Sequence, residues 1–413
     1  MRSLGELVNV RRDSGARCHI PGRTPSLLAV GLLLSACGGS AAPASTPAAS
    51  SAAAKPASAA AAPASASPKP AASSAPAASA KPAASAATAA SPPPAASGLQ
   101  HIKIGAVGIT ADAPLYIAQD MGYYREQGLD AEFVPFQTAG DSIPALSQGQ
   151  IDAGSGAMSA ALFNAIARGA EIRIVADKGQ HSGSPINGFT SALVVAVPKG
   201  DLGKYKTYAD VKGKNIAVTG TGTGQEPMWD KALQTVGLSI KDINLKPMAF
   251  ADMAAALNSR AVDLAGVIEP FVAQGEAKGL LEVRWMSEEL YEGQQGGITM
   301  FGPKISKDMG NRFMVAYVKG LRDYYDAFGK QKKNTARMIE ILANNTPVKD
   351  KALYEKMRWD YYNPDGYVNT PAVAYDLDWY AAHDYVKQKP DLSKVIDNSY
   401  VDFAISKLGK YQG

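Results

Sequence analysis

Short apolar runs alternate with helix-like stretches along the chain from about residue 100 onward. Ile102–Val107 and Leu193–Val197 are typical of buried strands, and Ala113–Gln127 has the length and apolar spacing of a helix. Strands separated by helices indicate βαβ units in a mostly parallel sheet. The pattern therefore predicts an α/β fold, followed from Lys307 by a helical tail rich in Tyr and Trp.

The β/α pattern restarts after the strand at 193–197. We interpret 198–296 as a second lobe inserted into the first, and 99–197 plus 297–413 as lobe 1. Two extended crossings between α/β lobes create a cleft, and ligands in such sheets lie beyond the carboxyl ends of the strands. The turns between strands and helices are therefore the first places to look for a site.

The N-terminal segment has the pattern of a targeting signal. The apolar run at 26–36 is too short to span a bilayer, and arginines precede it. Leu34-Ser35-Ala36-Cys37 resembles the bacterial lipobox, which implies that 1–36 is a signal peptide and that Cys37 is lipidated. An ordinary secretory signal cleaved nearby is the alternative. The lipobox resemblance implies a lipid-anchored protein on the extracytoplasmic face of the membrane.

Residues 37–98 have the composition of a tether. After Cys37 they are almost entirely Ala, Pro and Ser, with Lys55, Lys69 and Lys81 as the only charges. A stretch with so few large apolar residues cannot bury enough surface to offset its ordering entropy. We therefore expect a disordered linker between a lipidated Cys37 and the folded body.

Composition narrows the chemistry available to residues 99–413. Both cysteines, Cys18 and Cys37, precede this part, and its histidines at 101, 181 and 383 show no metal-ligand spacing. We therefore expect no disulfide, no metal site and no cofactor. The same part carries 34 basic and 36 acidic residues, so no nucleic-acid partner is expected.

Three turns combine small residues with hydroxyl groups immediately before a predicted helix. They are 108–114, 154–159 and 220–224. Free backbone N–H groups and the positive end of a helix dipole can bind an anionic group at such turns. Gly, Ser and Thr are also common turn and N-cap residues without any ligand, and the spacing in 220–224 misses the fingerprints of nucleotide-binding loops.

Several segments resemble one family of solute receptors. Residues 104–132 are similar to the beginning of the NMT1/THI5-like family, which includes the SsuA/TauA-type substrate-binding proteins of ABC importers. Residues 149–154 and 257–266 resemble its two counterpart segments, and Ile268-Glu269-Pro270-Phe271 resembles its Glu-Pro element. The resemblance implies a two-lobed periplasmic-binding-protein type II fold with a hinge and an interlobe cleft.

The same resemblance implies a set of ligand-binding residues at the turns. They are Thr110, Ala111, Ser155, Gly156, Ala157, Met158, Thr221, Gly222, Thr223 and Glu269. For Glu269 an equally good interpretation is a carboxylate favoured by the start of a helix.

The function implied is that of an extracytoplasmic, monomeric solute-binding component rather than an enzyme. It would capture a small organic molecule, anionic or heteroaromatic, by closure of two lobes and deliver it to an ABC permease. One alternative is an enzyme of the pyrimidine-precursor-synthase type, although such relatives carry a cysteine-rich motif that 99–413 lacks. The other alternative is a ligand-sensing lipoprotein.

Overall fold

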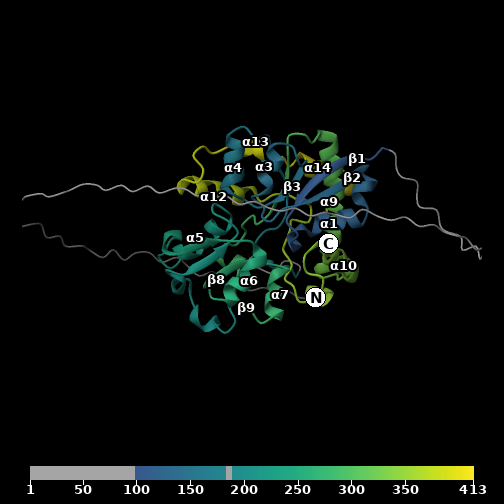
Figure 1. The fold of residues 1–413 in the computed structure, drawn as a ribbon. Helices are drawn as coiled ribbons and strands as arrows, with labels where there is room; N and C mark the ends of the chain where they lie inside the picture. Colours follow the sequence, from purple (N-terminus) through teal and green to yellow (C-terminus); the bar gives the residue numbers. More distant parts are fainter. Residues whose placement is uncertain (1–97, 183–187) are drawn as a thin grey trace, which may run out of the picture. The chain divides into compact units, whose positions relative to one another are not determined.

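The computed structural model describes residues 98–182 and 188–413. The predicted signal peptide, Cys37 and almost all of the tether lie outside these residues. The described part contains two five-stranded sheets with helices around them, and Figure 1 shows their elements gathered in two groups.

The first sheet has the strand order β2-β1-β3-β10-β4. These strands span Leu129–Pro135, Gln100–Ala106, Ala153–Gly156, Ile298–Phe301 and Arg173–Asp177. β1 pairs in parallel with β2 and β3, whereas β10 is antiparallel to β3 and β4. β10 is thus a paired strand in the first sheet, whereas the sequence predicts only an extended crossing between the lobes there.

The second sheet has the order β7-β6-β8-β5-β9. These strands span Asn244–Pro247, Asn215–Val218, Leu264–Ile268, Leu193–Pro198 and Leu281–Met286. β5 is antiparallel to β8 and β9, and its backbone hydrogen bonds therefore tie it to this sheet. The boundary placed at 197/198 is wrong in this respect: residues 193–197 lie in the second sheet, and the chain enters that sheet between β4 and β5.

The prediction of mostly parallel sheets is confirmed, since four of the five strands in each sheet run in the same direction. Each sheet contains one antiparallel strand, because the chain crosses from one sheet to the other before β5 and again before β10. A strand that enters from the other sheet need not follow a right-handed βαβ crossover, so its direction is not fixed by that rule.

The helices cover both sheets and form the C-terminal tail. They are α1 (Ala113–Asp120), α2 (Tyr123–Glu126), α3 (Ser142–Ser147), α4 (Ala160–Ala167), α5 (Gln225–Gln234), α6 (Phe250–Asn258), α7 (Phe271–Ala277), α8 (Ser287–Leu290), α9 (Lys307–Phe328), α10 (Thr335–Asn345), α11 (Lys351–Tyr354), α12 (Thr370–Ala382), α13 (Leu392–Val395) and α14 (Ser399–Leu408). Short 3₁₀ helices lie at 110–112, 202–204, 208–211 and 240–242.

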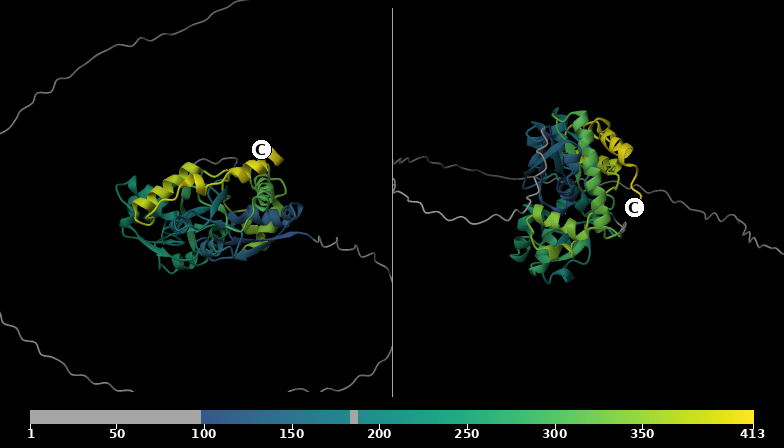
Figure 2. Two further views of the ribbon diagram at one scale, coloured as in Figure 1. Left: turned by 90° about the horizontal axis from the view of Figure 1, so that it is seen from above. Right: turned by 90° about the vertical axis from the view of Figure 1, so that its right-hand side faces the viewer.

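The helix expected over 113–127 is interrupted. α1 ends before Gly122, which has a φ of 80°, and α2 begins directly after it. Glycine adopts this left-handed backbone without the steric cost that a side chain brings. The tail is helical as predicted, and its segments run along one side of the body in Figure 2.

The longest helix, α9, forms the centre of the main core. Its side chains at Phe313, Tyr317 and Leu321, spaced four residues apart, are fully buried. α9 packs against α1 at Gly320, where an added Cβ would lie 2.3 Å from the carbonyl oxygen of Pro114. Glycine at this position therefore permits the close packing that holds the turn before α1.

Candidate functional site

A cavity of about 100 Å³ lies between the two sheets. Residues of the first-sheet side include Val107, Ile109 and Ala157, and residues of the second-sheet side include Leu193 and Ile268. The walls are largely apolar, with a few polar groups between them. A cavity with apolar walls and a few convergent polar groups is the usual form of a small-molecule site.

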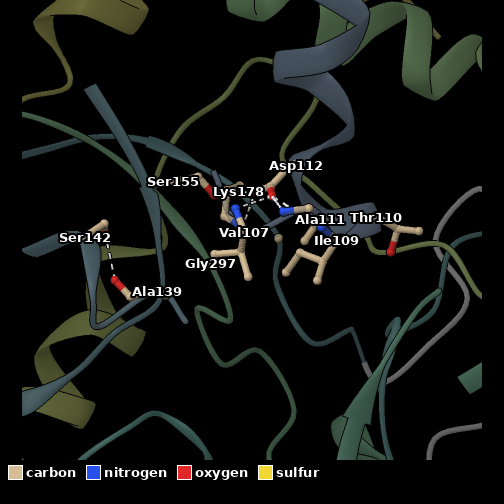
Figure 3. A network of polar contacts seen from close by, with 12 residues as sticks. Val107, Ile109, Thr110, Ala111, Asp112, Ala139, Ser142, Ser155, Lys178 and Gly297 are labelled. Carbon is tan, nitrogen blue, oxygen red and sulfur yellow. Dashed lines mark hydrogen bonds and ion pairs between the residues drawn. The ribbon is translucent and has the colours of Figure 1, made fainter. Parts of the chain in front are cut away.

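Asp112 organises the polar groups beside this cavity. Its Oδ2 accepts hydrogen bonds from the backbone N–H groups of Val107 (3.0 Å), Gly108 (2.9 Å) and Ile109 (3.4 Å). Its Oδ1 accepts from the hydroxyl of Ser155 and from Lys178 Nζ, which lies 3.1 Å away. Figure 3 shows these contacts converging on one carboxylate.

Asp112 and Lys178 are both almost completely buried. Burial alone would raise the pKa of Asp112, but the Lys178 ammonium, together with the donated hydrogen bonds, brings this pKa below its usual value. Asp112 is therefore a carboxylate at neutral pH, and the pair carries no net charge. Lys178 lines the cavity, and Asp112 fixes its ammonium group from behind.

The second predicted turn follows β3. Gly156 and Ala157 line the cavity, whereas the Ser155 side chain is engaged with Asp112. Met158 is fully buried in the apolar core, and its carbonyl oxygen accepts from the Gly224 N–H. The helix α4 begins directly after this turn, at Ala160, and the Ser159 side chain caps it by accepting from the Leu162 N–H.

The third predicted turn, in the second sheet, is held by its own helix. The Gly222 N–H donates to Glu226 Oε1 at 2.7 Å, and the Thr219 N–H donates to Gln225 Oε1 at 3.1 Å. Thr223 lines the cavity, but Thr221 is exposed to solvent and does not.

Glu269 and Thr110 join the two sheets rather than lining the cavity. The backbone oxygen of Glu269 accepts from both the N–H and the hydroxyl of Thr110. The Glu269 carboxylate accepts from the Ala273 N–H and from Arg358, in the tail. Burial raises the pKa of Glu269 to about 7. The bond from the Ala273 N–H, near the start of α7, agrees with the interpretation of Glu269 as a carboxylate favoured by the start of a helix.

Four of the ten predicted ligand-binding residues thus line the cavity, namely Ala111, Gly156, Ala157 and Thr223. The other six lie behind it, beside it or at the surface: Thr110, Ser155, Met158, Thr221, Gly222 and Glu269. Ligand contact by the first four stays a prediction.

Sequence reasoning missed most of the polar lining. Lys178 and His181 follow β4, and the carboxyl-end argument used for the other strands would have found them. Gln294 and Gln295 precede β10, a strand that was not recognised. Asp360 comes from the helical tail, where nothing in the local sequence signals a cavity residue.

Burial shifts the titration of these added groups. It lowers the pKa of His181 to about 4, a shift that the nearby Gln294 side chain opposes in part. It raises the pKa of Asp360 to about 7 and that of Asp177, which lies behind the cavity, to about 6. His181 is therefore neutral at pH 7, when Lys178 is the only cationic side chain lining the cavity in the part of the chain that the structure describes.

Residues 98–182 and 188–413 contain no group of three or more His, Cys, Asp or Glu side chains placed to hold a metal ion. The same ranges contain no helix with the length and apolar character to cross a bilayer.

Comparison with known proteins shows which proteins the chain resembles. The model of the family described as "NMT1/THI5 like" matches residues 110–292, which confirms the resemblance seen in the sequence. A Brucella abortus (strain 2308) protein, named only as a "Putative binding protein", is 28% identical over 156 residues. That alignment covers 38% of this chain and 44% of the relative, so the chain spans less than half the length of the curated relatives it matches.

Solved structures show the fold. The ligand-binding component of an ABC-type import system from Staphylococcus aureus superimposes with a TM-score of 0.61, at 17% identity over 74% of this chain and 99% of that one. The periplasmic aliphatic sulphonate binding protein SsuA from Escherichia coli gives a TM-score of 0.55, at 21% identity over 72% and 92%. The chain therefore has the periplasmic-binding-protein fold, as predicted.

Proposed function

We propose that this protein is the extracytoplasmic solute-binding component of an ABC importer. The observation that carries the proposal is a cavity lined from two sheets, in a fold shared with solute receptors. In such a receptor the two lobes close on a small organic molecule because each lobe contributes contacts to it. The closed complex then delivers the molecule to a permease.

The lobes in this proposal follow the sheets rather than the sequence boundary first drawn. One lobe contains the first sheet and most of the tail, and the other contains β5 through β9. Three backbone or hydroxyl contacts already join them at the cavity rim: Thr110 to Glu269, Ala160 to Gly222, and Gly224 to Met158. These contacts are the kind that a closed receptor would make.

We further propose that Cys37 is the lipid-bearing residue and that the Ala/Pro/Ser stretch to residue 98 is a tether. The support is the lipobox-like sequence and the composition of the stretch. An anchored receptor can remain close to its permease without crossing the membrane itself.

A thermal-shift screen tests the binding function. A ligand present at 100 times its Kd stabilises the folded protein by about 2.7 kcal/mol, which is readily measured. Ala157→Phe places a ring in the cavity and should abolish the shift produced by any compound that binds there. Ala161→Phe, on the exposed face of α4, is the matched control and should keep it. A ligand that stabilises Ala157→Phe as well as the unmodified protein would contradict the proposed site.

A further inference from the structure

Two of the three turns that suggested an anion site already donate backbone N–H groups to the protein's own side chains. Asp112 takes three N–H groups of the first turn, Glu226 takes the Gly222 N–H, and Gln225 takes the Thr219 N–H. The N–H group of Gly179, after β4, donates to Asp177 Oδ1 at 2.9 Å. An anionic ligand would therefore have to displace internal acceptors in order to use these donors.

The charged groups in and behind the cavity also disfavour an anionic ligand. Lys178 is matched by Asp112 at 3.1 Å, and both side chains are buried. Asp360 also lines the cavity, and Asp177 lies behind it. An anion placed beside this set would lose its hydration and gain no unpaired cation in return, which is a costly exchange in a buried site.

Two buried polar atoms of the lining, Gln294 Oε1 and His181 Nδ1, make no hydrogen bond of normal geometry among the described residues. Their side chains are 1% and 5% exposed, and they lie near enough to each other for Gln294 to raise the pKa of His181 against the effect of burial. The orientation of the Gln294 amide is fixed, because its Nε2 donates to the Gly224 carbonyl at 2.8 Å and to Asp376 Oδ2 at 3.1 Å. The remaining atom, Oε1, is therefore an acceptor to which a ligand N–H can donate.

The remaining donors complete the recognition pattern. The Lys178 ammonium has three N–H bonds and needs only one for Asp112, so it can also donate to a ligand oxygen. The neutral His181 ring can donate or accept at Nδ1. Apolar walls at Val107, Leu193 and Ile268 surround these groups.

From these contacts we infer that the cavity selects an uncharged solute bearing an amide-like edge, such as a carboxamide or lactam, and discriminates against the corresponding anion. The amide N–H would donate to Gln294 Oε1, and its carbonyl would accept from Lys178. The inference rests on the proposed function and names the class of its solute.

Matched pairs of compounds test this inference on the mature full-length protein. We would titrate acetamide against acetate, benzamide against benzoate, and nicotinamide against nicotinate, following the shift in melting temperature. The amide of at least one pair should bind about tenfold or more tightly than its carboxylate. Tighter or equal binding of the carboxylate in the pairs that bind, or no binding by any amide, would overturn the inference.

Variants that remove a charge distinguish selective recognition of the amide from general damage to the cavity, because they are compared by the ratio of amide to carboxylate affinity. Asp112→Asn keeps an acceptor for the turn but leaves Lys178 without a counter-charge, so the amide-to-carboxylate ratio should fall about tenfold. Asp360→Asn should lower the ratio without touching that ion pair, and it serves if the first variant does not fold. Asp378→Asn, on the exposed side of α12, is the control and should leave the ratio unchanged. A general defect would weaken both compounds of a pair together and leave their ratio where it was, which would also overturn the inference.

These outcomes are distinct from failure of the proposed function. Another compound that binds the unmodified protein and is blocked by Ala157→Phe would preserve the receptor even if every amide fails. If no compound of any class is blocked by that variant, the cavity is not the site and both proposals fall.

Discussion

Gly297 shows how a residue without a side chain allows close packing in the cavity lining. A Cβ built at this position would lie 2.5 Å from the backbone oxygen of Lys178 and 3.1 Å from its Cε. The closest atom belongs to the backbone and cannot rotate away. The path of the chain through Gly297 and the position of Lys178 therefore depend on each other. Figure 3 shows the two residues close together.

We predict that Gly297→Ala lowers the free energy of unfolding by about 1–3 kcal/mol, the usual cost of overpacking a buried position. Urea denaturation followed by circular dichroism would measure it. Gly203→Ala is the control, because a Cβ at Gly203 meets nothing within 4 Å and its change should stay within about 0.5 kcal/mol. Equal effects of the two substitutions would refute the steric argument.

Asp376 gives a prediction about pH. Its carboxyl is fully buried, and burial raises its pKa to about 8, although the Gln294 hydrogen bond and the Lys231 charge act in the opposite direction. Tyr291, Tyr375 and Tyr380 also interact electrostatically with it. The folded protein holds this proton over a pH range in which the unfolded chain, with a pKa near 3.8, has released it.

Stability contributed by this proton is complete below pH 4 and is lost as the pH rises toward 8. Between pH 6 and pH 8.5 we expect Asp376→Asn to lose less stability than the unmodified protein, by on the order of 2 kcal/mol. Urea denaturation of both proteins at the two pH values measures the difference. The other buried carboxyls titrate in both proteins and cancel in the comparison. If both proteins lost the same free energy of unfolding between pH 6 and pH 8.5, Asp376 would not titrate in this range.

The small and hydroxyl-bearing residues that precede the predicted helices identified some of the cavity-lining residues but not all of them. Ala111, Gly156, Ala157 and Thr223 line the cavity because each lies at the carboxyl end of a strand or just beyond it. Thr221 lies in such a turn too, yet it is exposed, and the next residue, Gly222, has a left-handed backbone with a φ of 69°. Which side of a turn faces the cavity depends on backbone angles that composition does not reveal.

At the scale of elements, α12 connects the two sheets through its side chains. Trp379 Nε1 donates to Asp230 Oδ2 on α5 at 2.8 Å, and the neighbouring Tyr380 packs against Phe163 on α4. α5 accompanies the second sheet and α4 the first. The helix therefore bridges the two lobes with consecutive residues.

We predict that Trp379→Phe costs about 1.5–3 kcal/mol, the usual range for a hydrogen bond to a charged group. Asp230 keeps its bonds from the Ile240 N–H and from Gln234, so the helix α5 should remain intact. Chemical denaturation measures the loss. Asp378→Ala removes only an exposed ion pair on the same helix and should cost less than about 1 kcal/mol. A tryptophan variant as stable as the unmodified protein would argue against a bridging role for this bond.

Most helices and strands were predictable, because the pattern of apolar residues within each one is sufficient to indicate its type. The strands β5 and β8 are contiguous apolar runs, and their expected positions agree with the structure within a few residues. β10 was missed because four buried residues, Ile298–Phe301, look the same in a strand and in an apolar crossing. Its pairing with β3 and β4 is decided by distant parts of the chain, which a single sequence does not display.

At the scale of the whole molecule, the two cysteines allow a direct test of the anchor. Cys37→Ala should abolish incorporation of labelled fatty acid, since the thiol is the proposed lipid attachment point. Cys18→Ala, which alters the other cysteine, should retain the label. Electrophoresis of labelled membranes distinguishes them. Fatty acid still carried by Cys37→Ala would exclude the proposed attachment site.

The antiparallel strand β10 also bears on the order in which the chain acquires its structure during synthesis. It lies between β3 and β4 in the first sheet, although more than a hundred residues follow β4 before it emerges. All five strands of the second sheet, from Leu193 to Met286, leave the ribosome earlier. The first sheet therefore begins to be synthesised earlier but is completed later. The place of β10 between β3 and β4 stays unfilled until the whole second sheet has been made.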